Sequence, residues 1–386
     1  MGIKEKQVYQ GFELGPIRPP SEARSLLLRV TRNCAWNKCT FCKVYKRTKF
    51  SFRPIEHIIQ EIDTIHEVIT IIRDILEQSP HQTVDQIQTA DDRFSSYNRN
   101  LLYLALDWWL HGNGAVFLQD ADSLILKPDQ LAIILEHLRY RFPWINRITS
   151  YARSHTINRI SGTGLKLLAL AGLNRIHIGM ESGSDRVLNR INKGVTKQGH
   201  IDAGQLVKSA GIELSEYVMP GLGGAELSEE HALETADALN HINPDFIRLR
   251  SLTIMPDTPL YGQLISGEFK KNTELQTIVE IRSMIEHLTD IASIIKSDHN
   301  HNLLQEIDGT LPQDKHKLLQ VLDAFLHLSE LDQVVFQLGR RMGYFQDLHD
   351  LQSPARRTYL SKVCSQNQLT SATIDQFLEQ HTPLYM

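Results

Sequence analysis

The 386 residues are enough for one large domain or two medium ones, and 41% hydrophobic with 22% charged residues is an ordinary globular composition. A formal net charge of −4 argues against a general affinity for nucleic acid, a membrane surface or an acidic ligand. The N-terminus lacks an apolar secretory segment and no stretch reaches the roughly 18 apolar residues of a spanning helix, so a cytoplasmic protein is expected.

The first quarter of the chain predicts a strand and a long helix. Residues 1–24 look like a lead-in that ends in the proline-rich "GPIRPPSEAR", and the core is expected to begin after it. The apolar run "SLLLRV" at 25–30 predicts a buried strand. The segment 54–76 has apolar residues at helical spacing, with Pro54 suited to the first turn. Residues 77–113 are expected to form a helical insertion.

From residue 114 onward, short apolar runs alternate with segments of helical periodicity. The five further expected strands are "AVFLQD", "INRITSYA", "NRIHIGM", "IELSEYVMP" and "DFIRLRSLTI". Such alternation predicts an α/β fold with a parallel sheet and right-handed crossovers, closed or partly closed as a barrel. Past about residue 270 only helices are expected, so 271–386 is predicted to be a C-terminal helical region.

Polar or glycine-rich loops follow the expected strands. They contain "QDADS", "YARS", "MESGSD", "MPGLGG" and "IMPDTP", and a cysteine-bearing loop follows the first strand. In barrels of parallel strands, the loops at the carboxyl ends of the strands carry the functional groups. The sequence therefore predicts one site at which these loops meet.

Three of the four cysteines stand close together in "RNCAWNKCTFCKVYK". Cys34, Cys39 and Cys42 fit a cubane iron-sulfur cluster, which three thiolates can hold while one iron stays open. A zinc site is the alternative, but it needs a fourth ligand, which would have to be Cys364 or a histidine such as His57. Polar neighbours disfavour buried apolar thiols here, whereas Cys364 is expected to be structural.

The cysteine loop resembles that of the radical S-adenosylmethionine (SAM) superfamily, which usually reads CxxxCxxC with an aromatic residue before the last cysteine. Phe41 occupies the aromatic position, and the first gap holds four residues, so the match is to a variant of the motif. The resemblance covers roughly residues 25–260 and places a core barrel at 25–270. It implies a partial (β/α)6 TIM-like barrel, a 4Fe-4S cluster on the three cysteines, SAM as cofactor, oxygen sensitivity and an external electron donor of the flavodoxin or ferredoxin type.

Later motifs resemble the branch with methylthiotransferases, the Elongator-type acetyltransferase and the oxygen-independent coproporphyrinogen oxidases. "VFLQDADSLIL" stands where the family has a GGE motif, and Asp120 or Asp122 is expected to supply the carboxylate for the SAM ammonium. "IHIGMESGSDRVLNRINKGVT" implies that Glu181 and Ser182 approach the SAM ribose and carboxylate. In "YVMPGLGG", Gly221 is expected to let the backbone approach the adenosine.

Three arginines lie on expected strand ends. Arg153 is expected to pair with the SAM carboxylate or a substrate acid, or else to form a surface ion pair. Arg248 and Arg250 alternate along the last strand, so both would face one side. Facing the lumen they would bind an anion, and Arg250 is included among the expected cofactor ligands; the alternative is an outward face covered by helices.

The substrate and any catalytic residue stay open. The segment 43–53 interleaves five basic residues with three aromatic ones, which suits either single-stranded nucleic acid or a solvated loop. A small-molecule substrate is expected because neither cysteines for a second cluster nor a small RNA-binding domain is found, with RNA or a protein residue as alternatives. A metal role for His299 and His301 is a minor possibility. A non-catalytic iron-sulfur protein and a zinc-stabilised scaffold are the competing classes.

Overall fold

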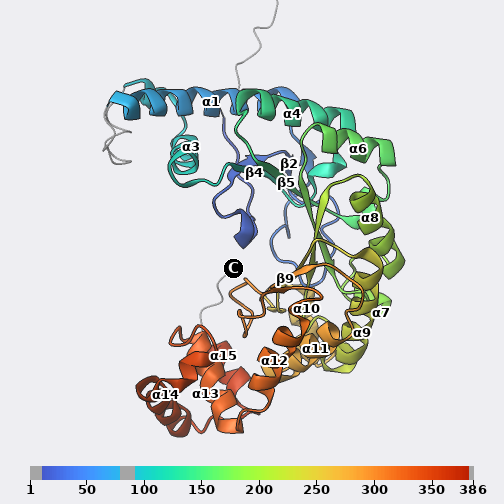
Figure 1. Ribbon diagram of the computed structural model, residues 1–386, viewed down its shortest axis with the longest axis vertical. Coiled ribbons are helices and arrows are strands. Elements are labelled where there is room, and N and C mark those ends of the chain that lie inside the picture. The colour runs from blue at the N-terminus through green and yellow to red at the C-terminus, as the bar shows by residue number, and fades with distance from the viewer. Residues whose placement is uncertain (1–10, 79–91, 382–386) are drawn as a thin grey trace, which may run out of the picture. The chain divides into compact units, whose positions relative to one another are not determined.

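The computed structural model describes residues 11–78 and 92–381 (Figure 1). The chain divides into two compact units, which are described separately. The first unit comprises residues up to Asn37, Val44–Ile178 and Gln205–Leu214, and the second comprises Lys38–Lys43, Gly179–Gly204 and the chain from Ser215 onward. Parts of the expected lead-in and insertion, residues 1–10 and 79–91, lie outside the described residues.

The first unit is built on parallel strands in the order β1, β4, β5, β6. Their bounds are β1 Leu26–Arg29, β4 Ala115–Gln119, β5 Arg147–Ala152 and β6 Arg175–Glu181. Leu27 pairs with Phe117 and Phe117 with Thr149, all in parallel register. A separate antiparallel pair joins β2 (Thr31–Arg32) to β3 (Ser51–Phe52), and the three clustered cysteines lie between these two short strands.

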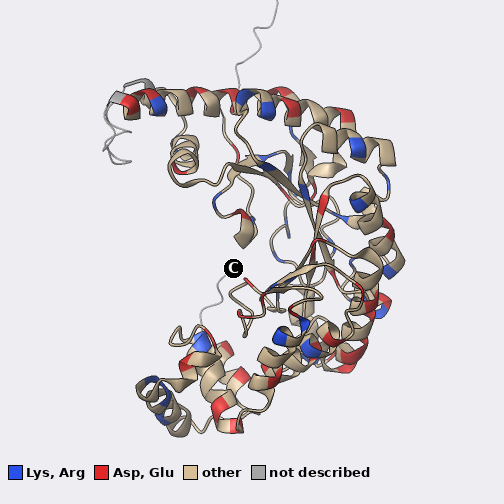
Figure 2. Ribbon diagram, viewed as in Figure 1, with Lys and Arg blue, Asp and Glu red and all other residues tan. Residues whose placement is uncertain are grey.

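Helices of the first unit bury their apolar faces against one another and the sheet. They are α1 Ile55–Gln78, α3 Arg99–His111, α4 Pro128–Arg141, α5 Ser154–Ile157 and α6 Gly162–Leu170, with 3-10 turns at Pro20–Glu22, Asp92–Ser96 and Ser123–Ile125. In α1, apolar residues at helical spacing such as Ile58, Ile62 and Ile65 are fully buried. Helix α1 packs on α4, beside which it lies in Figure 1. Figure 2 shows acidic and basic residues interspersed along both helices.

Residues 11–24 are part of this packing, although the core was expected to begin after them. The Glu22 carboxylate is fully buried beside Arg147, His177 and Ser25. Hydrogen bonds from His177 and Ser25 and the charge of Arg147 outweigh desolvation and lower the pKa of Glu22 to about 2. The lead-in is therefore held to the sheet by a buried charge.

The second unit continues the parallel pattern. Strand β7 (Glu213–Val218) pairs with β8 (Phe246–Leu249), and β8 pairs with β9 (Ile294–Lys296), all parallel, while β10 (Gly309–Thr310) runs antiparallel to β9. Its helices are α7 Asp185–Arg190, α8 Lys197–Ser209, α9 Gly224–Ile242, α10 Pro259–Ser266, α11 Glu274–Glu286, α12 Lys315–Leu326, α13 Glu330–Arg341, α14 Pro354–Gln366 and α15 Ile374–His381, with a 3-10 turn at Leu348–Gln352. Helix α11 begins with a capping box between Thr273 and Gln276 and packs on α9 and α12.

The predicted α/β class is confirmed. Parallel strands alternate with helices, as in a partial (β/α)6 TIM-like barrel. The expectation of helices alone after residue 270 is wrong, because β9 and β10 lie there. Strand β9 is only three residues long, too short to leave a periodic pattern. The domain boundaries at 24 and 270 stay a prediction. Among the described helices, none combines the length and apolar character needed to cross a membrane.

Candidate functional site

The cysteine loop begins in the first unit with a constrained backbone. Asn33 and Asn37 have φ values of 67° and 45°, in the left-handed region that asparagine tolerates better than most residues. The backbone N–H of Asn37 donates to Cys34 Sγ at 3.3 Å. The local backbone therefore fixes the position of the Cys34 sulfur.

Asp120, at the carboxyl end of β4, holds this loop. Its carboxylate is fully buried, and Oδ2 accepts the backbone N–H of Asn33 at 2.9 Å, immediately before Cys34. Arg29 donates to the same oxygen through Nε at 3.0 Å and Nη2 at 2.7 Å. Oδ1 accepts the Tyr45 hydroxyl at 2.6 Å. The carboxylate is thus engaged in anchoring the loop, and its expected contact with the SAM ammonium stays a prediction.

The part of the loop with Cys39 and Cys42 belongs to the second unit. Thr40 fixes it there, because its N–H donates to the Ile191 carbonyl at 2.9 Å and its carbonyl accepts the Leu260 N–H at 3.0 Å. Phe41 packs against a buried apolar group formed by Val187, Ile191, Met219, Leu222, Leu227, Leu252, Leu260 and Phe269. Phe41 is therefore an apolar anchor of the loop, and a contact with SAM stays a prediction.

The thiols differ in exposure. Cys34, Cys39 and Cys42 are not disulfide-bonded and are partly exposed, whereas Cys364 is buried in α14, and burial raises the pKa of its thiol. Within residues 11–78 and 92–381, no three His, Cys, Asp or Glu side chains stand close enough together to hold a metal ion. The donors nevertheless suit an iron-sulfur cluster in their chemistry, since all three are reduced, accessible sulfur ligands on one short loop.

Asp122 lies in a different environment from Asp120. It is almost fully buried, Oδ2 accepts the Thr156 hydroxyl, and burial raises the pKa of the carboxyl to about 7, against the opposing effects of Thr156 and Arg153. The Arg153 guanidinium lies over the Trp36 ring, 5.0 Å from its centroid, so it contacts the cysteine loop. Roles for Asp122 and Arg153 in binding SAM stay predictions.

Replacing Asp122 with asparagine is expected to remove a pH dependence of stability. Because the folded pKa of about 7 exceeds the reference value of 3.8, the wild-type free energy of unfolding should fall as pH rises from about 4 to about 7, by up to about 1.4 kcal/mol per pH unit. Below this window both states are protonated and above it both are ionised. The Asp122→Asn protein should therefore gain stability relative to wild type across the window. Urea unfolding at several pH values measures the difference, and a constant difference would contradict the expectation.

Glu181 is the last residue of strand β6 and Ser182 follows it; both belong to the second unit. Glu181 has φ 65°, and its Oε1 accepts Lys193 Nζ at 3.0 Å. Gly179 leaves room for this pair, since a Cβ there would overlap with the Glu181 carboxylate. Ser182 is fully buried; its Oγ lies 2.7 Å from His231 Nδ1 and accepts the N–H of Ser184 at 3.0 Å.

The contacts of His231 fix its orientation. Its Nε2 lies 3.1 Å from the Met219 carbonyl, which can only accept, so Nε2 carries a proton, and Glu280 Oε1 lies 3.6 Å from the same nitrogen. Ser182 is thus engaged with protein partners. Its expected approach to SAM, and that of Glu181, stay predictions.

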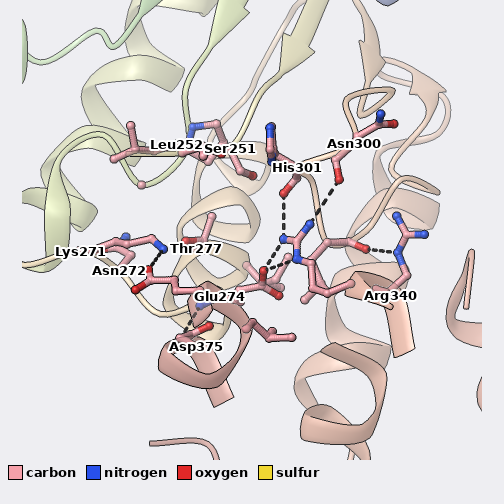
Figure 3. Close-up of a pocket in the computed structure, with 18 residues that line it drawn as sticks. Ser251, Leu252, Lys271, Asn272, Glu274, Thr277, Asn300, His301, Arg340 and Asp375 are labelled. Carbon is pink, nitrogen blue, oxygen red and sulfur yellow. Dashed lines mark hydrogen bonds and ion pairs between the residues drawn. The ribbon is translucent and has the colours of Figure 1, made fainter. Parts of the chain in front are cut away.

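Gly221 has φ 85° and donates its N–H to Glu280 Oε1 at 2.6 Å. The other oxygen of Glu280 accepts from the Ser228 hydroxyl and from Asn272 Nδ2 at 3.0 Å. A buried carboxylate of α11 therefore fixes the glycine-rich loop after β7. Gly221 also lines a cavity of about 210 Å³ within the second unit (Figure 3). Its contact with adenosine stays a prediction.

The two strand-end arginines have different surroundings. Arg248 is buried and donates to Asp298 at 2.7 Å, so its guanidinium already has an acidic partner. Arg250 is exposed. The burial of His299 and the charges of Arg250 and His301 lower the pKa of His299 to about 3. The His299 and His301 rings stand 5.0 Å apart. Arg250 as a cofactor ligand stays a prediction.

Several site residues were missing from the sequence-based expectations. Arg29 and Tyr45 bind Asp120, Lys193 binds Glu181, and Glu280 binds Gly221. A charged residue inside the apolar run "LLLRV" was a usable signal for Arg29, because an arginine in a buried strand needs a partner. Glu280 gave no signal, since an acidic residue in a helix is usually on the surface.

The middle of the chain is similar to a known protein family. Residues 99–237 match the radical SAM superfamily. The chain is 28% identical to the 4′-phospho-dehydrooxetanocin synthase of Priestia megaterium over 56% of its length, 27% identical to a tRNA uridine(34) acetyltransferase of Methanocaldococcus infernus over 28%, and 23% identical to a tRNA-2-methylthio-N(6)-dimethylallyladenosine synthase of Chlorobium phaeobacteroides over 74%. The matches span 26%, 20% and 54% of these relatives, which is less than two thirds of each.

Proposed function

We propose that this chain is a radical SAM enzyme that cleaves SAM reductively at a 4Fe-4S cluster held by Cys34, Cys39 and Cys42; the match of residues 99–237 to the radical SAM superfamily supports this. When bound, the cluster and SAM together supply a 5′-deoxyadenosyl radical that acts on a substrate. In this proposal, residues of the chain hold the cluster and SAM, orient them and keep water away from them.

One observation carries the proposal: the cysteine loop is held at both ends by a single buried carboxylate. Asp120 accepts the Asn33 N–H before Cys34 and the Tyr45 hydroxyl after Cys42. A metal ligand acts only when neighbouring groups orient it. A solvated loop that binds no ligand would not need a buried carboxylate to hold it, because burying a carboxylate is unfavourable unless all its hydrogen bonds are made.

Residues of the second unit support SAM binding in this proposal. The Glu181 carboxylate, positioned by Lys193, would accept hydroxyl donors of the ribose, and Gly221, positioned by Glu280, would let backbone approach the adenosine. The apolar group around Phe41 would keep water away from the loop, which matters for reactive species.

The proposed substrate is a small molecule. The proposed electron donor is a flavodoxin- or ferredoxin-like protein, and the proposed compartment is the reducing cytoplasm. An RNA substrate is the alternative, because two of the relatives are named as tRNA-modifying enzymes. A non-catalytic iron-sulfur protein is the second alternative, because three cysteines alone would satisfy it.

Anaerobic reconstitution with iron and sulfide, followed by dithionite and SAM, tests the proposal. We expect release of 5′-deoxyadenosine, detected by chromatography, that requires both SAM and reductant. A brown protein that leaves SAM intact would identify an electron carrier instead. A colourless protein that binds zinc would support the scaffold class and overturn the proposal.

A further inference from the structure

The loops after β6 and β7 meet on one helix, α9, within the second unit. The loop after β7 leads directly into α9, whereas the loop after β6 crosses the middle of that helix. A Cβ on Gly183 would overlap with the carbonyl oxygen of Glu234, so only glycine lets this loop come so close to the helix backbone. The Gly183 N–H also donates to Thr235 Oγ1 at 2.9 Å. The middle of α9 is therefore a fixed support for the loop after β6.

His231, one helical turn before Thr235, contacts both loops through its two ring nitrogens. Nδ1 lies 2.7 Å from Ser182 Oγ, in the loop after β6. Nε2 donates to the Met219 carbonyl at 3.1 Å, in the loop after β7. Because the ring is rigid, the distance between its two nitrogens is fixed. One side chain thus sets the separation of the two loops.

Glu280, in α11, extends this contact to the glycine-rich loop. Its Oε1 lies 3.6 Å from His231 Nε2 and accepts the Gly221 N–H at 2.6 Å. Helix α11 packs on α9 (Figure 1). Both His231 and Glu280 are buried, so the polar contacts between them are shielded from water. A chain of buried polar contacts therefore runs from Ser182 through His231 and Glu280 to Gly221.

This chain of contacts begins where the backbone pairing of β6 and β7 ends. The Met219 N–H donates to the Glu181 carbonyl at 3.0 Å, and Ser182 and Gly221 follow that bond along their own strands. Past the end of a sheet, side-chain hydrogen bonds replace the backbone ladder as the constraint on a loop. The contacts of His231 are such a constraint on both loops.

We propose that His231 is a positioning residue for SAM, which holds the loops after β6 and β7 at the separation that SAM binding needs. This rests on the proposed function, in which Glu181 contacts the ribose and Gly221 lets the backbone approach the adenosine. A ligand that contacts two loops binds more tightly when the free protein already holds them in place, because ordering them would oppose binding. The His231 ring is only 1% exposed, so it acts through Ser182 and Met219.

Replacing His231 with phenylalanine keeps a ring and removes both contacts. We expect the dissociation constant for SAM to rise at least about tenfold, measured by calorimetric titration of anaerobically reconstituted full-length protein without reductant. With dithionite present, the KM for SAM should rise while kcat for 5′-deoxyadenosine release stays within about twofold of wild type. Iron content should stay at the wild-type level.

Glutamine and asparagine at position 231 separate the two contacts. The amide nitrogen of glutamine is as many bonds from Cβ as Nε2 of histidine, and that of asparagine as many as Nδ1. His231→Gln should therefore keep the contact with Met219, and His231→Asn the contact with Ser182. Each should weaken SAM binding less than His231→Phe does. Both variants keep the proposal testable if the phenylalanine variant does not fold.

Amide hydrogen exchange of the protein without cluster or SAM gives a readout that is independent of activity. His231→Gln should speed exchange in residues 182–187 and leave 219–224 unchanged, and His231→Asn should do the reverse. Exchange within β8 should be the same in both variants and in wild type. Equal acceleration in all three segments would indicate general loosening and overturn the positioning role.

The matched control is His200→Phe, which replaces a fully buried histidine of α8 in the same unit. This variant should lose stability and keep the wild-type affinity for SAM. Normal SAM cleavage together with wild-type SAM affinity in His231→Phe would refute the role of His231 alone. A wild-type protein that binds no SAM would refute the proposed function, and with it the role that rests on it.

Discussion

Replacing Cys39 with alanine is expected to abolish iron binding and SAM cleavage together. A site-differentiated 4Fe-4S cluster needs three thiolates to hold it, and the described loop offers no fourth cysteine to substitute. Iron should fall from about four atoms per chain to nearly none after reconstitution, and 5′-deoxyadenosine release should fall at least about 100-fold. Iron content, absorption near the cluster bands and chromatography of the nucleoside measure these quantities.

The matched control is Cys364→Ala. This thiol is buried in α14, and its removal deletes one sulfur from a packed interior, at a cost of about 1 kcal/mol. Iron content and nucleoside release should stay at the wild-type level. Full iron loading of the Cys39→Ala protein would contradict the ligand assignment, and loss of iron in the Cys364→Ala protein would point to a ligand set that includes Cys364.

Replacing Asp120 with alanine is expected to lower the free energy of unfolding by roughly 3–5 kcal/mol and to prevent cluster loading. The change removes one of the two carboxylates paired with Arg29, leaving Glu13 at 3.7 Å, and it removes the acceptors of the Asn33 N–H and the Tyr45 hydroxyl. The loop would then sample many backbone conformations. Because cluster binding would have to order the loop, its binding free energy would become less favourable. Urea unfolding and iron content, measured on the same preparation, test both effects.

A loss of stability alone would not distinguish anchoring of the loop from general damage, and Gln119→Ala serves as the control. Gln119 is the neighbouring buried polar residue, but its side chain holds Gly15 and Ile17 and makes no hydrogen bond to the cysteine loop. We expect the Gln119→Ala protein to lose stability and to load iron normally. An Asp120→Ala protein that folds and takes up about four irons would refute the anchoring role.

Features carried by local pattern could be predicted from the sequence. Strands β1, β4, β5, β6 and β7 fall within two residues of the expected runs, because a buried parallel strand is a short continuous apolar segment between helical periods. The resemblance to the radical SAM superfamily was visible because Cys34, Cys39 and Cys42 are neighbours along the chain, and spacing within one loop needs no tertiary information.

Contacts between residues far apart in sequence were decided by the tertiary structure. Nothing in the sequence links Asp120 to Tyr45 or Glu280 to Gly221, since each pair meets only after the chain between them has folded. Strand β9 is equally hidden, because three residues form a strand only by pairing with β8. The sequence by itself determined the kinds of element, which depend on local periodicity, and its spacing of Cys34, Cys39 and Cys42 carries the proposal of a thiol ligand set. Only the tertiary structure decided which carboxylates hold the loops, because a polar group's role depends on the partners that folding brings to it.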